Sequence, residues 1–566
     1  MEELKPSAAN SSPLTPLGFL DRAAMVYGDC PSVVYGDRVH TWSETRSRCL
    51  RVASALVAEG IRRGDVVSVV APNVPAMYEL HFAVPMSGAI LNCINTRLDS
   101  RTVSVLLRHA ESKLVFVDWQ LRPLIVDAIS LFPPTNRRPR LILISNDDYH
   151  QEEVGGDVRR VEPNTDLSTY EGMVERGDPG FRWIRPESGW SPMVLNYTSG
   201  TTTSPKGVVH CHRGLFLVTV DSLLDWAVPK QPVYLWTLPM FHSNGWGFTW
   251  GMAAVGGTNI CLRKFNASTI FSHIERNGVT HMCAAPVVLN MLSSCGGGDC
   301  KTKLKSPVQI ITAGSPPPAA VLHRTESLGF IVSHGYGLTE TSGVVVSCAW
   351  KPQWNSLPAD QRAKLKARQG VRTAGFTEVE VVDPKTGIPV NHDGLTLGEV
   401  VLRGACVMLG YFKDPTGTAK CMNRTGGWFY TGDVGVMHPD GYLEIKDRSK
   451  DVIISGGENL SSVEVESVLY THPAVKEAAV VARPDEYWGE TPCAFLSLKV
   501  EEDATGGKLP MEREIMEFCR ARMPHYMVPK TIVFKDELPK TSTGKIQKYL
   551  LREEATSMGS AKMSRM

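Results

Sequence analysis

The chain has 566 residues, which is more than one compact core accommodates, so roughly two to four domains or subdomains are predicted. Its 43% hydrophobic and 21% charged residues are typical of a globular enzyme, and no apolar run approaches the ~18 residues of a bilayer span. Lysine and arginine number 60 against 59 aspartates and glutamates, a net charge of +1, which argues against a nucleic-acid-binding protein.

The N-terminal segment and the cysteines indicate an intracellular protein. Residues 1–6 are polar and acidic, without the apolar core of a secretion signal. The 13 cysteines are odd in number, scattered and without a C-x-x-C pair, which is typical of reduced thiols. The run His210–His212 alternates in direction on a strand, and Cys295 and Cys300 flank a loop-like segment. We therefore predict no metal site at either place.

Helical and strand-like patterns alternate over residues 41–130. Trp42–Glu59 has apolar residues at helical spacing, and Asp65–Ala71 has the pattern of a buried strand. Tyr78–Gly88 is again helical and Leu114–Asp118 is again a strand. This alternation predicts a mostly parallel sheet covered by helices.

The middle of the chain is predicted to contain a polar segment that runs over the surface, called a surface excursion, and a second α/β unit. Residues 146–178 are polar, acidic and contain glycine, so a surface excursion is expected. A second α/β pattern runs from Val233 to Tyr336. The charged stretch Trp354–Gln369 predicts a helix that faces solvent.

Short β-rich segments follow Gly370, with turn signals between them. They are Glu378–Val382, Gly398–Leu402 and Gly441–Ile445. The charged run Lys446–Asp451 comes next, and a compact α/β pattern continues almost to the end. We therefore predict an α/β fold with a large N-terminal domain of two α/β subdomains plus a β-rich subdomain, and a small mobile α+β C-terminal domain. The predicted boundaries are 1–449, 450–557 and a tail of 558–566, with a hinge near Lys450.

A hydroxyl-rich loop follows the strand-like Met193–Leu195. Thr198 to Thr203 are all hydroxyl or glycine residues, and Ser204, Pro205, Lys206 and Gly207 come after them. Backbone N–H groups, hydroxyls and one ammonium can meet there, which suits an anion with many acceptor oxygens, such as a polyphosphate. The G-x-x-x-x-G-K-[ST] pattern is absent, so this is not an ordinary P-loop. A solvated linker is the alternative interpretation.

A second candidate segment is His334–Thr341, which follows the strand-like Phe330–Ser333. Its two glycines let the backbone approach a ligand closely, and Tyr336 offers a flat ring for stacking. Thr339 and Glu340 supply hydroxyl and carboxylate oxygens that suit Mg²⁺.

Two more segments complete the set. In Tyr430–Val434 a single carboxylate, Asp433, is expected on a turn, where it could accept both hydroxyls of a ribose. Pro539–Ile546 is another hydroxyl-rich turn and carries Lys545. Each segment alone is compatible with an ordinary turn, but their joint occurrence in this order argues against coincidence.

The four segments, in this order, resemble those of the adenylate-forming superfamily: acyl-CoA synthetases, 4-coumarate–CoA ligases, luciferases and peptide-synthetase adenylation domains. The resemblance covers about residues 15–550. Leu238–Gly247 and the Ser-Arg-Met ending look most like plant peroxisomal acyl-activating enzymes, which include benzoate– and cinnamate–CoA ligases. The resemblance implies an ATP-dependent acid–CoA ligase that uses ATP, Mg²⁺ and coenzyme A. A carboxylate attacks the α-phosphorus and expels pyrophosphate, and the CoA thiolate then displaces AMP.

The resemblance also assigns roles in the nucleotide site. Glu340 would hold Mg²⁺, with Thr339 at the phosphates, and Lys545 would bridge the carboxylate and the α-phosphate. Asp433 and Arg448 would bind the ribose hydroxyls. The remaining positions are Thr198, Ser199, Gly200, Thr201, Thr202 and Lys206 at the β/γ-phosphates, and Gly314, Ser315, Pro316, Gly335, Tyr336 and Gly337 around the adenine.

The second half-reaction implies a rotation of the C-terminal domain about Lys450. His242 would line the passage between the acyl site and the pantetheine channel. The rotation would withdraw Lys545 and bring in the residues of the thiol tunnel, Ser455, Gly456, Gly457 and Asn459. The chain departs from the usual pattern at Thr203, where the family commonly has glycine, and at Ile454, where many relatives have lysine.

The acyl pocket is expected at nine positions that the resemblance places around the acid. Small residues there, Ser243 and Gly343, should leave room beside aromatic walls, which favours benzoate, cinnamate or an extended aryl-dienoate such as piperate. A short- or medium-chain fatty acid is the alternative. The expected lining is His242, Ser243, Asn244, Trp246, Phe248, Gly314, Gly335, Gly343 and Val344.

The site residues argue against other functions, and the C-terminal residues predict a partner. A luciferase-like oxidative enzyme is a distant alternative, and a silent binding protein is disfavoured because Lys545, Glu340, Asp433 and Lys206 are all present. The ending Ser564–Met566 resembles the peroxisomal import tripeptide Ser-Lys-Leu, which predicts an import receptor as partner and the peroxisome as location, with the cytoplasm as alternative. We expect a monomer or a weak homodimer.

Overall fold

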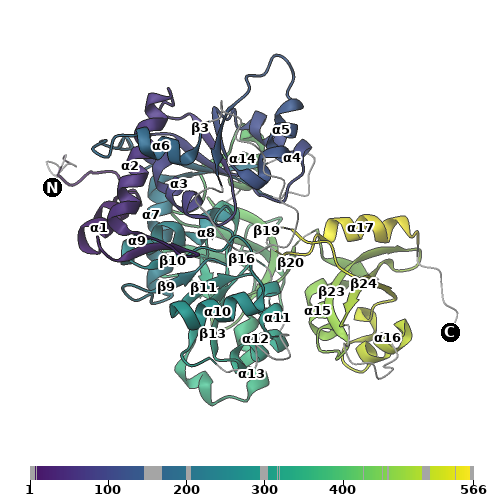
Figure 1. Ribbon diagram of the computed structural model, residues 1–566. Coiled ribbons are helices and arrows are strands. Elements are labelled where there is room, and N and C mark those ends of the chain that lie inside the picture. The colour runs from purple at the N-terminus through teal and green to yellow at the C-terminus, as the bar shows by residue number, and fades with distance from the viewer. Residues whose placement is uncertain are drawn as a thin grey trace, which may run out of the picture.

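In the computed structural model, the strands of the described part of the chain form four sheets. Figure 1 shows three of them gathered with their helices into one large body, while the strands near the C-terminus form a smaller lobe beside it. The described residues are 7, 9–145, 168–198, 206–293, 304–314, 317, 319–422, 424, 426–448, 450–455, 458–499, 510–541 and 544–560.

The first sheet contains the predicted N-terminal α/β pattern. Its strands lie in the order β18 (Gly410–Tyr411), β8 (Gly207–Cys211), β7 (Pro192–Tyr197), β4 (Ile90–Cys93), β3 (Val66–Val70), β5 (Leu114–Asp118) and β6 (Arg140–Ile144). The five strands from β7 to β6 are parallel. Every residue of β3 is buried, as expected of a strand with helices on both faces.

Helices between these strands confirm the predicted alternation. They are α2 (Trp42–Ala58), α3 (Pro75–Met86), α4 (Ser100–His109), the 3₁₀ turn η1 (Trp119–Leu121) and α5 (Arg122–Ser130). α2 begins where it does because Thr41 caps it: the Thr41 hydroxyl accepts from the Glu44 N–H, and the Glu44 carboxylate accepts from the Thr41 N–H.

The predicted excursion over residues 146–178 is wrong at its C-terminal end. Residues 146–167 lie outside the described residues, but Tyr170–Arg176 forms helix α6, which packs on α2 and buries Tyr170. Its Glu171 pairs with Arg48, which also pairs with the fully buried Glu79. Seven residues are too few to show a helical period in a polar stretch, so this helix could not be predicted from the sequence.

The second sheet lies at the centre of the large body. Its order is β15 (Val371–Arg372), β14 (Val346–Ser347), β13 (Phe330–Tyr336), β12 (Val308–Thr312), β11 (His281–Ala284), β9 (Val233–Leu235), β10 (Thr258–Ile260), β1 (Pro31–Tyr35) and β2 (Arg38–Thr41). The N-terminal hairpin β1–β2 therefore joins this sheet through β10, not the sheet of the strands that follow it in sequence. Its helices are α1 (Gly18–Val26), α7 (His212–Asp225), α8 (Ser243–Trp246), α9 (Phe248–Val255), α10 (Ala267–Asn277), α11 (Pro286–Ser293), α12 (Ala319–Ser327) and α13 (Ala359–Ala367).

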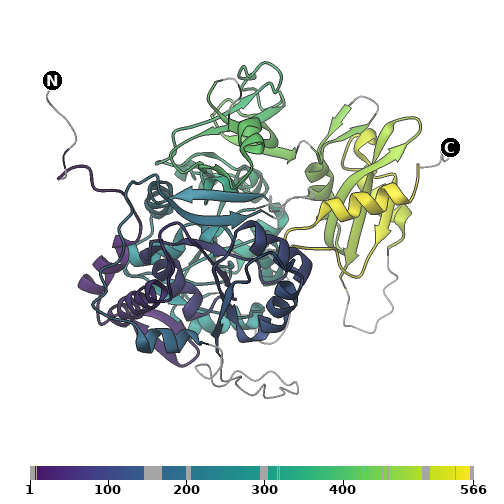
Figure 2. The ribbon, with the colours of Figure 1, turned by 90° about the horizontal axis from the view of Figure 1, so that it is seen from above.

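The third sheet confirms the β-rich subdomain, which Figure 2 shows as a block of its own beside the two α/β subdomains. Its strands are β16 (Glu378–Val382), β17 (Gly398–Arg403), β19 (Phe429–Met437) and β20 (Leu443–Arg448), all antiparallel. Tyr430–Val434 was predicted to be a turn, but it lies within β19. Gly432 has a φ of +75° and the β19–β20 register shifts after Val434, so a bulge produced the turn-like sequence.

The fourth sheet forms the C-terminal lobe. It contains β21 (Ile453–Ser455), β22 (Glu458–Leu460), β23 (Val475–Asp485), β24 (Gly489–Leu498) and β25 (Thr531–Phe534), with helices α15 (Ser462–Leu469), α16 (Glu512–Arg520) and α17 (Lys548–Ser557). Two hydrophobic clusters of this lobe draw only on residues from Ile453 onward. The expected hinge at Lys450 falls in the link between β20 and β21. None of the described helices combines the length and apolar character needed to cross a bilayer.

Candidate active site

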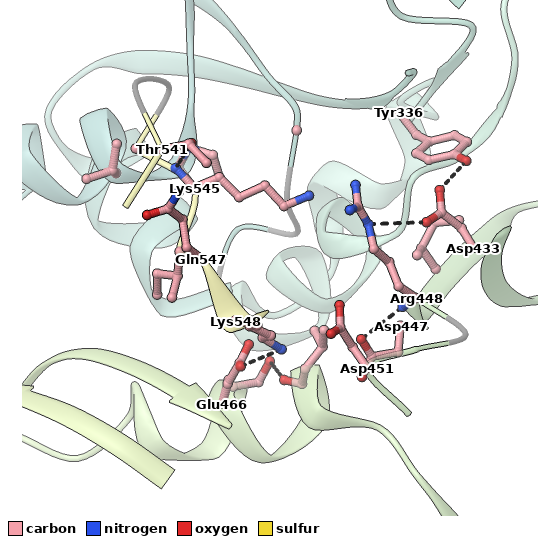
Figure 3. A pocket seen from close by; sticks show the side chains of 18 of the residues that line it. Tyr336, Asp433, Asp447, Arg448, Asp451, Glu466, Thr541, Lys545, Gln547 and Lys548 are labelled. Atoms are coloured by element: carbon pink, nitrogen blue, oxygen red, sulfur yellow. Dashed lines mark hydrogen bonds and ion pairs between the residues drawn. The ribbon is translucent and has the colours of Figure 1, made fainter. Parts of the chain in front are cut away.

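A cavity of about 260 Å³ lies where the large body meets the C-terminal lobe. One wall comes from β13 and the glycine-rich segment after it, with Gly335, Tyr336 and Gly337. The opposite wall comes from the turn before α17, which carries Lys545. Figure 3 shows the Lys545 side chain extending towards Arg448 and Asp433. The structure thus brings together three of the four predicted segments, which are far apart in sequence.

Asp433 contacts two other polar residues of the cavity wall that the large body forms. The β19–β20 register places Asp433 directly opposite Arg448, and their side chains approach to 3.6 Å between Arg448 Nε and Asp433 Oδ1. The Tyr336 hydroxyl donates to Asp433 Oδ2 at 2.6 Å, which fixes the ring against the cavity (Figure 3). One carboxylate is therefore held by two partners while it still faces the cavity. Such a carboxylate can accept further hydrogen bonds from a polyhydroxyl ligand.

The turn that carries Lys545 is tightly built. The Thr541 N–H donates to the Lys545 carbonyl at 2.7 Å, and the Gly544 N–H donates to the Thr541 carbonyl at 2.9 Å. Gly544 has a φ of +79°, and a Cβ there would lie 2.2 Å from a methyl of Val287. Only glycine adopts this φ without strain and has no Cβ to clash with Val287, so Gly544 allows the turn to pack against the large body.

The environment of the cavity favours the neutral form of Lys545. Removal from bulk water, reinforced by the positive charge of Arg448, lowers the pKa of Lys545 to about 7, and Asp433 opposes the shift. Removal from water also lowers the pKa of Lys450 to about 8, with Arg448 again contributing. An anionic ligand in this cavity would therefore restore positive charge to both lysines.

His242 lies close enough to Lys545 for the lysine charge to affect the pKa of His242. Burial is the larger cause and Lys545 the smaller one that lower the pKa of His242 to about 4, so its ring is neutral at neutral pH. A neutral imidazole can accept one hydrogen bond and donate another, which suits a residue between two reactants.

The five residues after His242 form a left-handed turn, which is rare for non-glycine residues. Ser243, Asn244, Gly245, Trp246 and Gly247 have φ values of 43°, 45°, 59°, 55° and 84°. Each non-glycine residue in this region costs about 1–3 kcal/mol, which other contacts must offset. The turn is fixed by a hydrogen bond of 2.5 Å from the amide of Asn196, near the end of β7, to the Asn244 side-chain oxygen.

Two of the glycines expected in the acyl pocket pack closely against neighbouring residues. A Cβ on Gly343 would meet Val218 at 3.1 Å and the Trp246 carbonyl at 3.4 Å, and a Cβ on Gly335 would meet Val344 at 2.5 Å. The room expected at Gly343 is therefore already filled by neighbours. Gly314 is the one of these three glycines with open space beside it.

Phe248, another expected member of the lining, packs inward. Its ring lies 5.3 Å from that of Trp226 and 5.4 Å from that of Tyr234, and its side chain is buried. Its aromatic neighbours show that it belongs to the hydrophobic core behind the turn. The sequence pattern identified an aromatic residue correctly but not the direction in which it points.

The phosphate end of the predicted site is described in part. Thr198 donates its N–H to the Lys206 carbonyl at 3.1 Å, which closes the neck of the loop. Lys206 Nζ lies 4.8 Å from the ring centre of Tyr411, and the Tyr411 hydroxyl donates to Glu340 Oε1 at 2.8 Å. Burial raises the pKa of Glu340, whereas Tyr411 and Lys206 oppose the shift. The predicted residues Ser199–Thr202, with Thr203, lie outside the described residues.

Thr339 and the hinge residues complete the predicted set. The Thr339 carbonyl accepts a hydrogen bond of 2.7 Å from the ring of His210, which ties the 3₁₀ turn η3 (Thr339–Thr341) to β8. Ser455 pairs with Gly489 of β24, and Asn459 lies on β22. Ser455 is not among the described residues that line the cavity. The predicted residues Ser315, Pro316, Gly456 and Gly457 lie outside the described residues.

Two family models match the chain: AMP-binding enzyme over residues 20–412, and AMP-binding enzyme C-terminal domain over residues 464–545. The chain belongs to the AMP-binding enzyme family. It is 66% identical to 2-methylpropanoate–CoA ligase CCL4 of Humulus lupulus over 563 residues, which cover 99% of this chain and 98% of the relative. It is 64% identical to probable acyl-activating enzyme 5, peroxisomal, of Arabidopsis thaliana over 567 residues, which cover 100% of both.

Solved structures of the family share its fold. Anthranilate CoA ligase AuaEII in complex with anthranoyl-AMP superposes with a TM-score of 0.83 at 25% identity, covering 98% of this chain and 99% of that one. Benzoate CoA ligase from Burkholderia xenovorans LB400 gives 0.79 at 22% identity, with coverages of 95% and 99%. The solved structures confirm the predicted fold. The family models and the two plant relatives confirm the predicted superfamily and reaction class: an AMP-forming acid–CoA ligase that uses ATP and CoA.

Tyr411 and Asp447 are site residues that the sequence analysis missed. Tyr411 lies on a two-residue strand, too short to show a pattern, and it reaches the site only through the pairing of β18 with β8. Asp447 lines the cavity but stands in a charged run that is typical of exposed surface.

Proposed function

We propose that acyl-adenylate formation takes place in the cavity between the two lobes, with Lys545 as its catalytic residue. The observation that carries this assignment is the convergence of Lys545, Arg448 and Asp433 in one cavity. Adenylation brings a carboxylate against the α-phosphate, so two anions must approach each other. An ammonium aimed at both would stabilise the transition state more than the separated reactants.

The other walls of the cavity fit the rest of ATP. Asp433, with two partners already in place, would accept the ribose hydroxyls beside Arg448. The ring of Tyr336 would stack on the adenine, and Gly335 and Gly337 would let the backbone approach it. Thr198 and Lys206 stand at the neck of the loop that would receive the β- and γ-phosphates.

Glu340 fits a bound Mg²⁺. Its carboxylate oxygens are the ligands that Mg²⁺ prefers, and no group of three or more His, Cys, Asp or Glu able to hold a metal occurs among the described residues. Mg²⁺ is commonly held by one or two carboxylates together with substrate phosphates, which matches a single Glu340 near the phosphate loop. The ion would neutralise charge on the departing pyrophosphate.

Thioester formation requires a different arrangement of the same chain. We place the pivot at Lys450, in the link between β20 and β21. Rotation there would withdraw Lys545 and bring the β21–β22 hairpin, with Ser455 and Asn459, towards the acyl-adenylate. The neutral ring of His242 would then stand beside the path of the incoming thiol.

For the acid itself, a short and compact aliphatic carboxylate fits the filled space best. Val218 and Val344 occupy the room beside Gly343 and Gly335, which an extended aryl-dienoate would need. The relative from Humulus lupulus is named for 2-methylpropanoate, a four-carbon branched acid. A compact aryl acid such as benzoate is the second candidate, favoured by the fold shared with a ligase that holds anthranoyl-AMP.

A panel of acids tests both proposals. The protein is incubated with ATP, Mg²⁺, CoA and 2-methylpropanoate, hexanoate, benzoate, cinnamate or piperate, and AMP and acyl-CoA are measured together. We expect kcat/KM to be highest for 2-methylpropanoate, lower for benzoate and lowest for piperate. Preferred use of piperate would overturn the compact-acid proposal. AMP without acyl-CoA across the panel would overturn CoA transfer, and light or oxidised product would indicate luciferase-like chemistry.

We also propose import into peroxisomes through the C-terminal Ser564–Met566, which lies outside the described residues. One relative carries the word peroxisomal in its name. The test compares an N-terminal fluorescent fusion of the full chain with its Met566→Glu variant in plant cells. The fusion should coincide with a peroxisomal marker and the variant should stay in the cytoplasm; unchanged import of the variant would dismiss the signal.

A further inference from the structure

Tyr411 stands between the two charged groups at the phosphate end of the site. Its hydroxyl donates to Glu340 Oε1 at 2.8 Å, and its ring centre lies 4.8 Å from Lys206 Nζ. Tyr411 lies on β18, Glu340 lies in η3, and Lys206 immediately precedes β8. One neutral side chain therefore contacts a carboxylate with its polar end and an ammonium with its ring.

The backbone around Tyr411 is held on every side. Tyr411 pairs with Val208 across the β18–β8 ladder, and its N–H donates to the Thr418 hydroxyl at 2.8 Å. The Phe412 N–H donates to the Gly207 carbonyl at 2.6 Å, immediately after Lys206. On the other side, the Met408 N–H donates to the Glu340 carbonyl at 2.8 Å. The strand that carries Tyr411 is thus bonded to the segments of both its charged partners.

These contacts leave both charged groups available to a ligand. A carboxylate has two oxygens with about four acceptor sites, so the Tyr411 hydrogen bond at Oε1 orients Glu340 without using all of its acceptor sites. An aromatic ring attracts an ammonium without neutralising it, whereas a carboxylate partner would cancel its charge. The Tyr411 ring therefore restricts the position of the Lys206 ammonium without acting as a competing anion.

We propose that Tyr411 is a positioning residue for the metal–phosphate end of the ATP site, orienting Glu340 towards Mg²⁺ through its hydroxyl and Lys206 towards the phosphates through its ring. The proposal rests on the proposed role of Glu340 in holding Mg²⁺. Tyr411 touches neither the acid nor the reacting atoms in this account.

The test measures equilibrium binding, so no turnover is needed. Calorimetry gives the dissociation constants of ATP at increasing Mg²⁺, of ATP with EDTA, and of AMP, for wild type and Tyr411→Phe without acid or CoA. The variant keeps the ring and loses only the hydroxyl. We expect its affinity for MgATP to fall about tenfold and the half-saturating Mg²⁺ concentration to rise, while the AMP affinity stays unchanged.

A matched control separates this effect from the loss of any buried phenol. Tyr442 is buried, whereas Tyr411 is half-buried, and the Tyr442 hydroxyl donates to the Ala349 carbonyl at 2.6 Å. Tyr442→Phe should leave the Mg²⁺ dependence of ATP binding unchanged. Tyr411→Leu, which removes the ring as well, should also weaken ATP binding in EDTA, because Lys206 loses its support.

A double-mutant cycle with Glu340→Gln decides the mechanism. If the Tyr411 hydroxyl acts through the Glu340 carboxylate, Tyr411→Phe should have little further effect on MgATP binding in that background. Fully additive losses, or an unchanged Mg²⁺ dependence in Tyr411→Phe, would overturn the proposal. Because the readout is MgATP binding, these outcomes are distinct from a failure of CoA ligation, which shows only in the acid panel.

Discussion

Arg448, at the end of β20, and Lys545, in the turn before α17, bring two positive charges into one cavity from opposite sides of Lys450. The two cations repel each other in the ligand-free protein, and this repulsion adds to the effect of burial on Lys545. On the other side of Arg448 lies the carboxylate of Asp433, which is already bonded to Tyr336. A ligand with several negative charges would relieve the repulsion between Arg448 and Lys545, so this arrangement suits an anion.

The first prediction concerns pH. Lys545 has a pKa of about 7 in the ligand-free protein and must be charged to bind an anion, so binding of ATP should take up a proton at neutral pH. The affinity for ATP should fall as pH rises above 7, by up to about tenfold per unit, and should level off below pH 6. Calorimetry in buffers of different ionisation enthalpy measures both effects.

The same pKa fixes the sign of a stability effect. The unfolded chain keeps the Lys545 proton to about pH 10.4, whereas the folded ligand-free protein releases it near pH 7. The unfolded state binds more protons in that window, so this group makes the protein more stable as pH rises from 7 to 10. Lys545→Met should flatten both the ATP-binding and the stability profiles; an unaltered ATP profile in this variant would contradict the assignment.

The second prediction separates the two half-reactions. Lys545→Ala should reduce adenylation, followed by acid-dependent ATP–pyrophosphate exchange, by about 100-fold or more, because the charge that joins carboxylate and phosphate is lost. Conversion of a supplied acyl-adenylate to acyl-CoA should be nearly unchanged. Lys540→Ala is the matched control, since Lys540 lies in the same segment and pairs with Glu477 at 2.6 Å. Equal loss of both half-reactions in Lys545→Ala would argue against domain rotation.

The sequence predicted most of this site, because its parts are short motifs whose chemistry is local. Tyr336, Asp433 and Lys545 were named from residue type and order, Arg448 was named from the family resemblance, and all four line one cavity. What the sequence could not predict depends on neighbours distant along the chain. Tyr411 reaches Glu340 only through strand pairing, and the space beside Gly343 is decided by Val218, more than a hundred residues away. A glycine predicts conformational freedom but not an empty volume.

The third prediction concerns the bonds that cross the hinge. Asp447 precedes Lys450 and Ser462 follows it, yet the Ser462 N–H and hydroxyl both donate to Asp447 Oδ2, at 2.8 and 2.5 Å. Lys548 donates to the same hydroxyl at 2.6 Å. These bonds hold the lobes in the arrangement that keeps Lys545 in the cavity, and rotation about Lys450 would break them.

Removing the Ser462 hydroxyl should therefore shift the balance between the two arrangements. In Ser462→Ala, adenylation should fall about threefold to tenfold, whereas thioester formation from a supplied acyl-adenylate should not fall. Thr471→Ala serves as control, because Thr471 lies just after the same helix and its hydroxyl donates to the Val468 carbonyl of that helix at 2.6 Å. Stopped-flow measurement of each half-reaction checks the split, and a uniform loss in both would show that the bonds have only a structural role.

The fourth prediction tests whether the acyl group lies beside Gly343. A methyl of Val218 stands 3.1 Å from the position of a Cβ on Gly343, so Val218→Ala should open space there at a stability cost of roughly 1–3 kcal/mol. The ratio of kcat/KM for benzoate over 2-methylpropanoate should rise about tenfold, because differences of one or two carbons in an apolar pocket change binding by that order. Val220→Ala, on the same helix but 41% exposed, should leave the ratio unchanged. If Val218→Ala retains activity and its ratio equals that of Val220→Ala, the acid binds elsewhere and the filled space beside Gly343 does not set specificity.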